Sequence, residues 1–322
     1  MEISRKQFLK VTAAAAASAA IGSPGIKAAT TGKPKRGVSI YSYSGELYVT
    51  MTLEDCMADM YGMDARGIEI LANGHIEGYP NPSDAWVKNW HALCAKYNIV
   101  PVEYGHWVDS RMHEGRELTT KESYDTLVRD LKLANRLGFT VARTKLGVID
   151  NTLTPVKNWR EFIKMAIPEA QKLNVRMCPE IHSPTRLKSK MLDDYVDFIE
   201  KEKTTPWFGL NIDFGVFLNK PTAAMQAQMK GMGGTMTAGD KVEDIVPLLP
   251  FVHACHAKFV NMSDDFVETT TPYDEIIATL IKHNWDGYML SEYEGSNKDV
   301  PGYSSDQLRK QHVLMKRLLG EA

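Results

Sequence analysis

The sequence has little of what marks disulfide-rich, zinc-binding or nucleic-acid-binding proteins. Its 322 residues include four cysteines, with no C-x-x-C pair among them: Cys56, Cys94, Cys178 and Cys255. This spacing argues against a dense disulfide framework and against a structural zinc site. Lysine and arginine form no extended block, and the formal net charge is −2. A nucleic-acid-binding face needs a concentrated basic patch, so we expect no nucleic-acid partner.

The N-terminal region also lacks a run long enough to span a membrane. The apolar run 11–22 is only about half of the ~20 residues that a bilayer core requires, so we expect no stable membrane span. The run follows the basic segment SRKQFLK (4–10), an order typical of export signals. The segment is similar to a twin-arginine signal with Lys6 at the second arginine, and an ordinary secretory signal is the alternative. We expect residues 1–35 to be an export signal and linker, and the mature protein to be exported to a bacterial periplasm.

From residue 37 onward, short apolar runs alternate with amphipathic helical segments. Thr52 with Asp55, Ser83 and Thr120 mark expected helix starts. Eight strand–helix units predict a closed (βα)8 TIM barrel, a single α/β domain over residues 36–322. The expected strands begin near Gly37, Gly67, Ile99, Thr140, Val175, Phe208, Val252 and Gly287.

The last four apolar runs each end in a residue that can bind a metal. The carboxyl ends of barrel strands meet at one mouth, so residues far apart in sequence can meet there. Three carboxylates and one imidazole favour a hard divalent ion. The runs are VRMCPEIH (175–182), FGLNIDFG (208–215), VHACHAKF (252–259) and GYMLSEYEG (287–295), and the expected ligands are Glu180, Asp213, His256 and Glu292. His253, in the same run as His256, is the alternative histidine.

Other charged and aromatic residues are expected at the same mouth. His182 follows Glu180 by two positions, so it shares its face and is a candidate to bind a substrate hydroxyl or relay a proton. Lys145 is a candidate to stabilise an enolate oxygen. The expected substrate-binding residues are Glu69, His106, Trp107 and Lys258. For Lys145 the alternative is that it only balances the metal carboxylates, together with Arg143. For His182 the alternative is a solvated loop histidine, and for Glu69 and His106 it is a structural role.

The order of these four residues, with GIEI at 67–70 and SEYEG at 291–295, resembles the sugar phosphate isomerase/epimerase family of xylose isomerase-like barrels. The resemblance implies one divalent ion, Mn²⁺ first and Mg²⁺, Co²⁺ or Zn²⁺ after it, held by the four residues. It also implies that Glu180 and Glu292 exchange a substrate proton. Ketose 3-epimerases of this group have a histidine three residues after the aspartate, where this chain has Val216. The related DNA-repair endonucleases need more histidines than this chain supplies.

The expected reaction is removal of a proton next to a carbonyl, which gives an enediolate. Return of the proton gives isomerisation or epimerisation, so the first expectation is a sugar isomerase or epimerase. Loss of a β-leaving group would make the same site a lyase on keto-glycosides. A non-catalytic periplasmic sugar-binding protein is the third interpretation. No phosphate cradle is evident, so a non-phosphorylated sugar is expected. The sequence leaves a homo-oligomer open.

The connection over residues 216–251 is longer than a barrel requires. It contains four methionines near three glycines: Met225, Met229, Met232 and Met236. A mobile lid over the mouth and an insertion without a catalytic part are both open interpretations.

Overall fold

The structure is a computed structural model that describes residues 32–106, 116–144, 146, 154–221, 223, 226–227, 230 and 238–321. Residues 33–322 form one compact unit of the chain. The expected signal segment lies outside the described residues.

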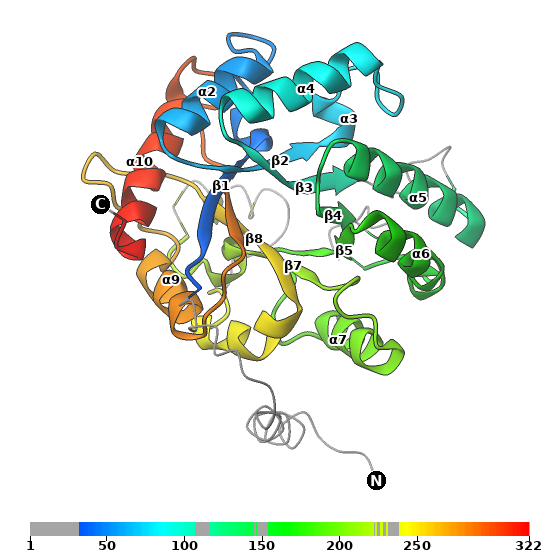
Figure 1. Cartoon of the computed structure of the whole chain (residues 1–322). Coiled ribbons are helices and arrows are strands. Elements are labelled where there is room, and N and C mark those ends of the chain that lie inside the picture. The colour runs from blue at the N-terminus through cyan, green and yellow to red at the C-terminus, as the bar shows by residue number, and fades with distance from the viewer. Residues whose placement is uncertain are drawn as a thin grey trace, which may run out of the picture. The chain divides into compact units, whose positions relative to one another are not determined.

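Parallel strands curl around a central axis, and helices lie outside them (Figure 1). All neighbouring strands pair in parallel, in the order β5-β4-β3-β2-β1-β9-β8-β7-β6. The strands are β1 (Lys35–Ser39), β2 (Gly67–Leu71), β3 (Val100–His106), β4 (Val141–Thr144), β5 (Arg176–Cys178), β6 (Glu180–Ile181), β7 (Leu210–Asp213), β8 (Val252–Phe259) and β9 (Tyr288–Tyr293).

The fifth expected strand is divided at Pro179 into β5 and β6. Proline has no N–H to donate to a sheet, so it interrupts the ladder. Met177 N–H donates to the carbonyl of Trp207 at 2.8 Å, and Gly209 N–H donates to the carbonyl of Met177 at 2.9 Å. These bonds join β5 to the chain that enters β7, while β6 pairs with β7 directly. The nine segments are therefore eight strands of one barrel, and the predicted TIM barrel is confirmed.

Helices return the chain along the outside of the barrel. They are α2 (Leu53–Gly62), α3 (Ala72–His75), α4 (Asp84–Lys96), α5 (Thr120–Arg136), α6 (Trp159–Leu173), α7 (Lys190–Glu202), α9 (Tyr273–Lys282) and α10 (Tyr303–Leu319), with the 3-10 helix η1 (Ile40–Tyr43) after β1. Thr52 and Asp55 form the expected capping box, and Ser83 caps α4 by accepting from Trp86 N–H at 3.1 Å. The cap of α5 is Thr119 rather than Thr120, because the Thr119 side chain and Glu122 exchange hydrogen bonds across the first turn.

The connection between β7 and β8 contains two further 3-10 helices, η2 (Phe214–Phe217) and η3 (Val242–Phe251). Pro247 and Pro250 lie inside η3. Proline removes the i to i−4 hydrogen bond of an α-helix, which explains why this segment winds as a 3-10 helix. The four methionines of this connection lie outside the described residues, so the lid interpretation stays a prediction.

Small and apolar side chains fill the inside of the barrel below the carboxyl ends of its strands. Val102, Ala254 and Leu290 pack together there, with the half-buried Tyr288 against them. Side chains two positions apart on a strand share a face, so His256 and Glu292 lie one layer nearer the carboxyl ends than Ala254 and Leu290. The apolar layer thus forms the floor of the polar site.

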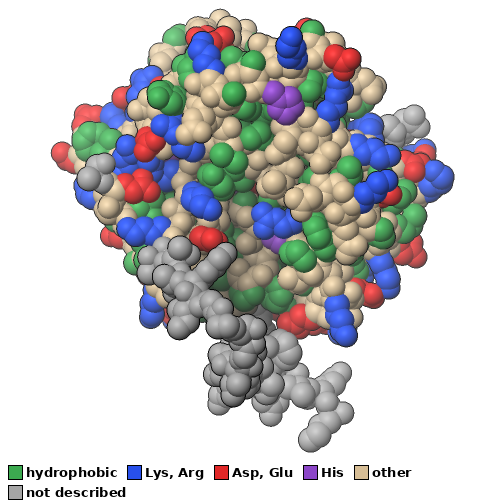
Figure 2. Space-filling model, viewed as in Figure 1, with side chains coloured by type: hydrophobic (Ala, Val, Ile, Leu, Met, Phe, Trp, Pro, Cys, Tyr) green, Lys and Arg blue, Asp and Glu red, His purple; other side chains and the backbone are tan. Residues whose placement is uncertain are grey.

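The surface carries both signs of charge. On the face in Figure 2, lysine and arginine side chains alternate with aspartate and glutamate, and no broad patch of one sign is visible. Within the described residues, no helix combines the length and hydropathy needed to cross a membrane.

Candidate metal centre

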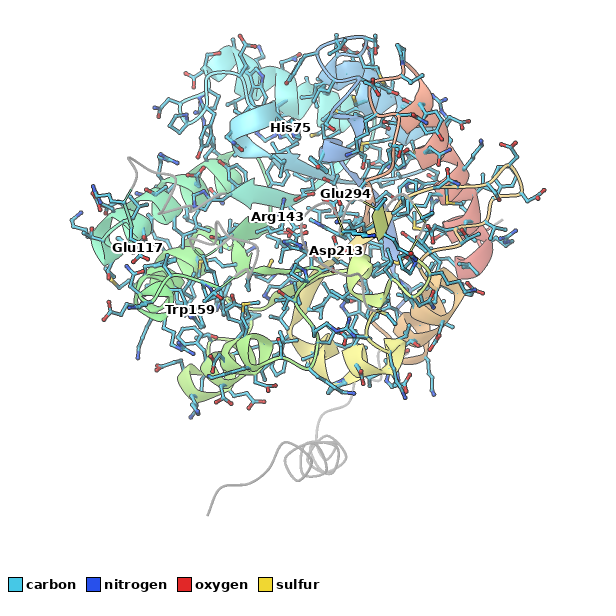
Figure 3. All side chains as sticks on the ribbon, turned by 180° about the vertical axis from the view of Figure 1, so that it is seen from behind. His75, Glu117, Arg143, Trp159, Asp213 and Glu294 are labelled. Atoms are coloured by element: carbon cyan, nitrogen blue, oxygen red, sulfur yellow. The ribbon has the colours of Figure 1, made fainter. Side chains whose placement is uncertain are left out.

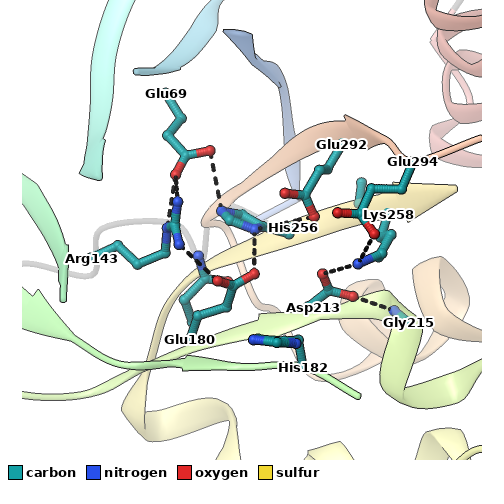
Figure 4. Close-up of polar contacts among 12 residues, drawn as sticks. Glu69, Arg143, Glu180, His182, Asp213, Gly215, His256, Lys258, Glu292 and Glu294 are labelled. Carbon is teal, nitrogen blue, oxygen red and sulfur yellow. Dashed lines mark hydrogen bonds and ion pairs between the residues drawn. The ribbon is translucent and has the colours of Figure 1, made fainter. Parts of the chain in front are cut away.

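Four neighbouring strands each bring one side chain to one point inside the barrel mouth (Figure 4). One ligand atom from each of Glu180 (β6), Asp213 (β7), His256 (β8) and Glu292 (β9) lies within 4.8 Å of the others. Figure 3 shows Asp213 near the centre of the barrel, whereas Trp159 lies among the outer elements. The four expected ligands are therefore brought together.

His256 lies between the two glutamates and is fully buried. Its Nδ1 is 3.0 Å from Glu180 Oε1 and 3.6 Å from Glu292 Oε2. Burial alone would lower the pKa of His256, but Glu69, Glu180 and Glu292 outweigh burial and raise this pKa well above its ordinary value. The carboxylates thus favour the protonated, positively charged form of His256.

Among the four expected ligands, two buried carboxylate oxygens have no hydrogen-bond donor: Asp213 Oδ2 and Glu292 Oε2. Burial, followed by the charges of Glu292 and Glu180, raises the pKa of Asp213 well above its ordinary value. The pKa of Glu292 is lowered to about 2, because His256 and Lys258 outweigh the effect of burial. Unpaired buried oxygens are costly, and a cation at their meeting point would satisfy them.

The charge inside the barrel supports the same conclusion. Five carboxylates surround the centre, namely Glu69, Glu103, Glu180, Asp213 and Glu292, and among the described residues two permanent cations, Arg143 and Lys258, contact them. With all five ionised, three negative charges are left over, and one divalent ion would offset two of them. Three carboxylates and one imidazole are also a donor set that such ions accept, so the residues present fit a metal.

A second layer of side chains holds these ligands. Arg143 donates from Nε to Glu69 Oε1 at 2.8 Å and from Nη1 to Glu180 Oε2 at 2.7 Å. Asn211 Nδ2 donates to both oxygens of Glu103 at 2.9 Å. Glu69 and Glu103 both contact the ring nitrogen of His256 that faces away from the ligand cluster. His256 Nε2 lies 3.3 Å from Glu69 Oε2 and 3.2 Å from Glu103 Oε2.

Glu69, Glu103 and His256 also lie close enough together to hold an ion. We assign them a different role, because Arg143 and Asn211 already occupy both carboxylates. A metal-binding histidine typically donates its other N–H to a carboxylate, which fixes its tautomer and ring orientation. In this arrangement Nε2 donates to Glu103 beside Glu69, and Nδ1 is left for a metal. Glu69, expected to bind substrate, is thus placed behind His256.

Lys258 and His182 lie at the mouth as expected. Lys258 Nζ is 3.6 Å from Asp213 Oδ2 and 2.5 Å from Glu294 Oε2. His182 is half-buried beside Glu180 and Asp213 (Figure 4), and its Nδ1 lies 2.8 Å from the carbonyl oxygen of Ser183. The pKa of Glu180 lies well below its ordinary value, because Arg143 and His256 outweigh the effect of burial. His182 makes a smaller contribution in the same direction. His253 is buried elsewhere in the barrel and is not part of the cluster.

Three expected residues are not placed at this cluster. His106 is buried, and its Nδ1 lies 3.2 Å from Asp130 Oδ2 of α5, so the ring faces the outer helix. Glu103 and Gly105 of the same strand share the inward face, and His106 therefore points outward. This placement corrects the expectation that His106 lines the mouth. Trp107 and Lys145 lie outside the described residues.

Sequence reasoning missed three residues of the site: Glu103, Tyr41 and Lys298. Glu103 could have been found, since it is a single charge within the apolar run VPVEYGH (100–106) of β3. Tyr41 and Lys298 come from the segments that follow β1 and β9, and no strand periodicity points to them. The Tyr41 hydroxyl interacts with Glu294, and burial together with Glu294 and Glu292 raises its pKa to about 12.

A parallel (βα)8 barrel with a carboxylate–histidine cluster at the mouth that could hold a metal ion defines the class of the chain as a TIM barrel with a candidate metal site. The model of the xylose isomerase-like TIM barrel family matches residues 58–316. The chain therefore belongs to this family of enzymes.

Two relatives match nearly the full chain at low identity. The 3'-dehydrocarminate deglycosidase alpha subunit of a Microbacterium species is 23% identical, over 89% of this chain and 96% of the relative. A C-glycoside deglycosidase alpha subunit of Arthrobacter globiformis is 24% identical, over 89% of this chain and 92% of the relative.

Solved structures share the fold. D-psicose 3-epimerase of Clostridium cellulolyticum superposes with a TM-score of 0.62 at 16% identity, covering 89% of this chain and 100% of that chain. A sugar phosphate isomerase/epimerase of Parabacteroides distasonis has a TM-score of 0.60 at 13% identity, over 91% of this chain and 96% of that chain. A probable 3-DHS dehydratase of Bacillus anthracis has a TM-score of 0.58 at 16% identity, over 88% and 98%.

Proposed function

We propose that the protein is a metal-dependent lyase that cleaves keto-glycosides by β-elimination. The observation that carries the proposal is the near full-length similarity to two deglycosidase subunits, combined with the carboxylate–histidine cluster. One of these relatives is named for a 3'-dehydro substrate, and this prefix denotes a glycoside oxidised at that carbon. In such a sugar the carbonyl at C3 acidifies the proton on C2, and the aglycone on C1 is the β-leaving group.

The cluster suits the first half of this reaction. A divalent ion held by Glu180, Asp213, His256 and Glu292 would stabilise the negative charge that develops when the proton next to the carbonyl leaves. The protein must also supply a base. The Oε2 atom of Glu292 has no hydrogen-bond donor, whereas Glu180 Oε2 already accepts from Arg143. We assign Glu292 as the group that removes the proton, and Glu180 as the carboxylate that holds or returns it.

The surroundings of the cluster suit a charged intermediate. Asp213 and His256 are fully buried, and the low water content around them strengthens charge interactions there. Arg143 and Lys258 stand on opposite sides of the carboxylates and limit their mutual repulsion. We assign His182, at the mouth, to contact a sugar hydroxyl.

A sugar isomerase or epimerase, the first expectation from the sequence, is the second candidate. The fold similarity to sugar epimerases favours it. The residue three positions after Asp213 speaks against a ketose 3-epimerase, because Val216 is buried within η2 and offers no polar group. The lyase is therefore our preferred proposal.

The test compares a phenyl glucoside with its 3-keto derivative. The Mn²⁺-loaded protein is incubated with each in D₂O, and products are followed by proton NMR. The lyase proposal predicts phenol and an unsaturated keto-sugar from the keto-glucoside alone. A C2 epimer with its phenyl group intact would instead identify an epimerase. Tight binding without any loss of the C2 proton signal would identify a sugar-binding protein.

A further inference from the structure

Lys298 is a cation at the barrel mouth that is not paired with an acid in the described part of the chain. It lies in the loop after β9, and its Nζ is 4.0 Å from the ring centroid of Tyr41 and 5.9 Å from that of Tyr293. The Tyr41 hydroxyl in turn interacts with Glu294, the carboxylate that Lys258 contacts at 2.5 Å, so Lys298 lies on the rim of the same mouth.

Lys298 differs in this respect from Lys258. Lys258 is held between two carboxylates, Asp213 and Glu294, at 3.6 and 2.5 Å. Lys298 rests instead on aromatic faces, which attract a cation without accepting its N–H groups as conventional hydrogen-bond acceptors do. Its three N–H donors are therefore available to a ligand. Burial lowers the pKa of Lys298 despite the opposing effect of Glu294 and Glu292.

The position of Lys298 is built into the fold. A Cβ on Gly45 would lie 1.7 Å from the carbonyl oxygen of Lys298, so only glycine lets the loop approach the segment after β1 this closely. The Tyr293 hydroxyl donates to the carbonyl of Ser296 at 2.5 Å, and Val300 N–H donates to the carbonyl of Asn297 at 3.0 Å. These contacts anchor the loop on both sides of Lys298.

We propose that, with an O-linked keto-glycoside, Lys298 contacts the leaving-group oxygen and stabilises the negative charge that develops on it. The inference rests on the proposed lyase function. The sugar ring must reach the buried Asp213 and His256, while Lys298 is only half-buried on the rim. The aglycone, which points from the ring toward the opening, is then the part of a glycoside nearest to Lys298.

In this elimination Glu292 removes the proton and Lys298 stabilises the leaving group. Glu292 takes the C2 proton, and the electron pair of that C–H bond forms the C1–C2 double bond. The C1–O bond breaks and its electron pair goes to the aglycone oxygen, which faces the ammonium of Lys298 and takes its proton from water. Preorganised donors of this kind are typically worth a factor of roughly 10² to 10³ in rate.

The test varies the leaving group. Lys298→Met should release 4-methoxyphenol from its 3-keto-glucoside roughly 10²-fold more slowly than wild type. Release of 4-nitrophenol, which needs little help to depart, should fall far less. Exchange of the C2 proton in D₂O should persist. Lys298→Arg should restore part of the methoxyphenol rate, and Lys282→Met, an exposed lysine at the end of α9, should behave as wild type.

The outcomes separate the two proposals. Equal slowing of both phenols, or no slowing of either, would overturn the role of Lys298 and leave the lyase standing. A wild-type protein that releases neither phenol from a keto-glucoside would overturn the lyase and this inference together. Metal content and circular dichroism of Lys298→Met should match wild type, because the side chain lies outside the core and the ligand set.

Discussion

Glu180 and Glu292 differ in how much of each carboxylate is already engaged. Arg143 donates to Glu180 at 2.7 Å, while Glu292 Oε2 accepts from no donor. Glu292→Gln keeps the shape of the side chain and removes the base, so turnover should fall by roughly 10²-fold or more. Steady-state release of phenol from a keto-glucoside measures this.

Glu180→Gln should also slow turnover on that scale, while both variants keep measurable metal binding through the remaining oxygen. His182→Ala should cost less, since we assign it to orient the substrate. Wild-type turnover in both glutamine variants would show that another residue moves the proton.

The upward pKa shifts of Asp213 and His256 give the metal affinity a pH dependence. Both pKa values are raised above their ordinary values, so the protonated forms are favoured without an ion. The stability that these protonated groups contribute is present at low pH and is lost as pH rises through the raised values. A divalent ion needs the ionised carboxylate and the neutral imidazole.

Metal binding should therefore release protons, and the affinity should rise with pH. Titration calorimetry of Mn²⁺ binding in two buffers with different ionisation enthalpies measures the release. Identical heats in both buffers, or an affinity that falls between pH 6 and 8, would contradict this account of the charges.

The sequence predicted those site residues that follow an apolar run at the end of a strand. It did not predict the site residues that lie inside a strand or in a loop. Glu180, Asp213, His256 and Glu292 could be predicted because each closes an apolar run. Glu103 lies within its strand, where an inward charge is recognised only once the barrel is closed. Lys298 reaches the mouth from a loop whose path depends on Gly45, more than 250 positions earlier in the chain.

At the scale of elements, helix α5 shows how the amphipathic pattern determines packing. Leu131 has no exposed surface, while its neighbour Lys132 is exposed. Leu131→Ala should lower the free energy of unfolding by about 2 to 5 kcal/mol, through lost burial and the cavity left behind. Lys132→Ala, the matched control, should change it by no more than about 0.5 kcal/mol. Chemical denaturation measures both, and equal effects would show that the helix does not pack through this face.

Two element boundaries differ from those expected from the sequence, and in each case one neighbouring residue decides the boundary. Thr119 and Thr120 are adjacent, and either can cap a helix; Glu122 selects Thr119 by completing the capping box. Pro179 leaves the fifth strand continuous in direction but divides its hydrogen bonds. His106 was expected at the mouth but faces outward. Successive residues of a strand point to opposite faces, so a shift of one residue in the expected end of β3 reverses the predicted face of His106.

At the scale of the whole molecule, the expected export of the protein remains to be measured. The basic segment 4–10 and the apolar run 11–22 predict a signal that is removed on export. Protein isolated from its native host should therefore begin between Ser23 and Lys35 and be found outside the cytoplasm. Mass spectrometry of the N-terminus measures this, and an intact Met1 on the bulk of the protein would contradict it.

The central claim is that one divalent ion, held by the four strand-end residues, is required for the reaction. The most direct measurement is a titration of metal-stripped protein with Mn²⁺, in which bound metal and phenol release from a keto-glucoside are followed in the same samples. Both should rise together and saturate at about one ion per chain, while Asp213→Ala and His256→Ala stay folded and gain neither. Full turnover by the stripped protein, or full metal occupancy in both variants, would contradict the account.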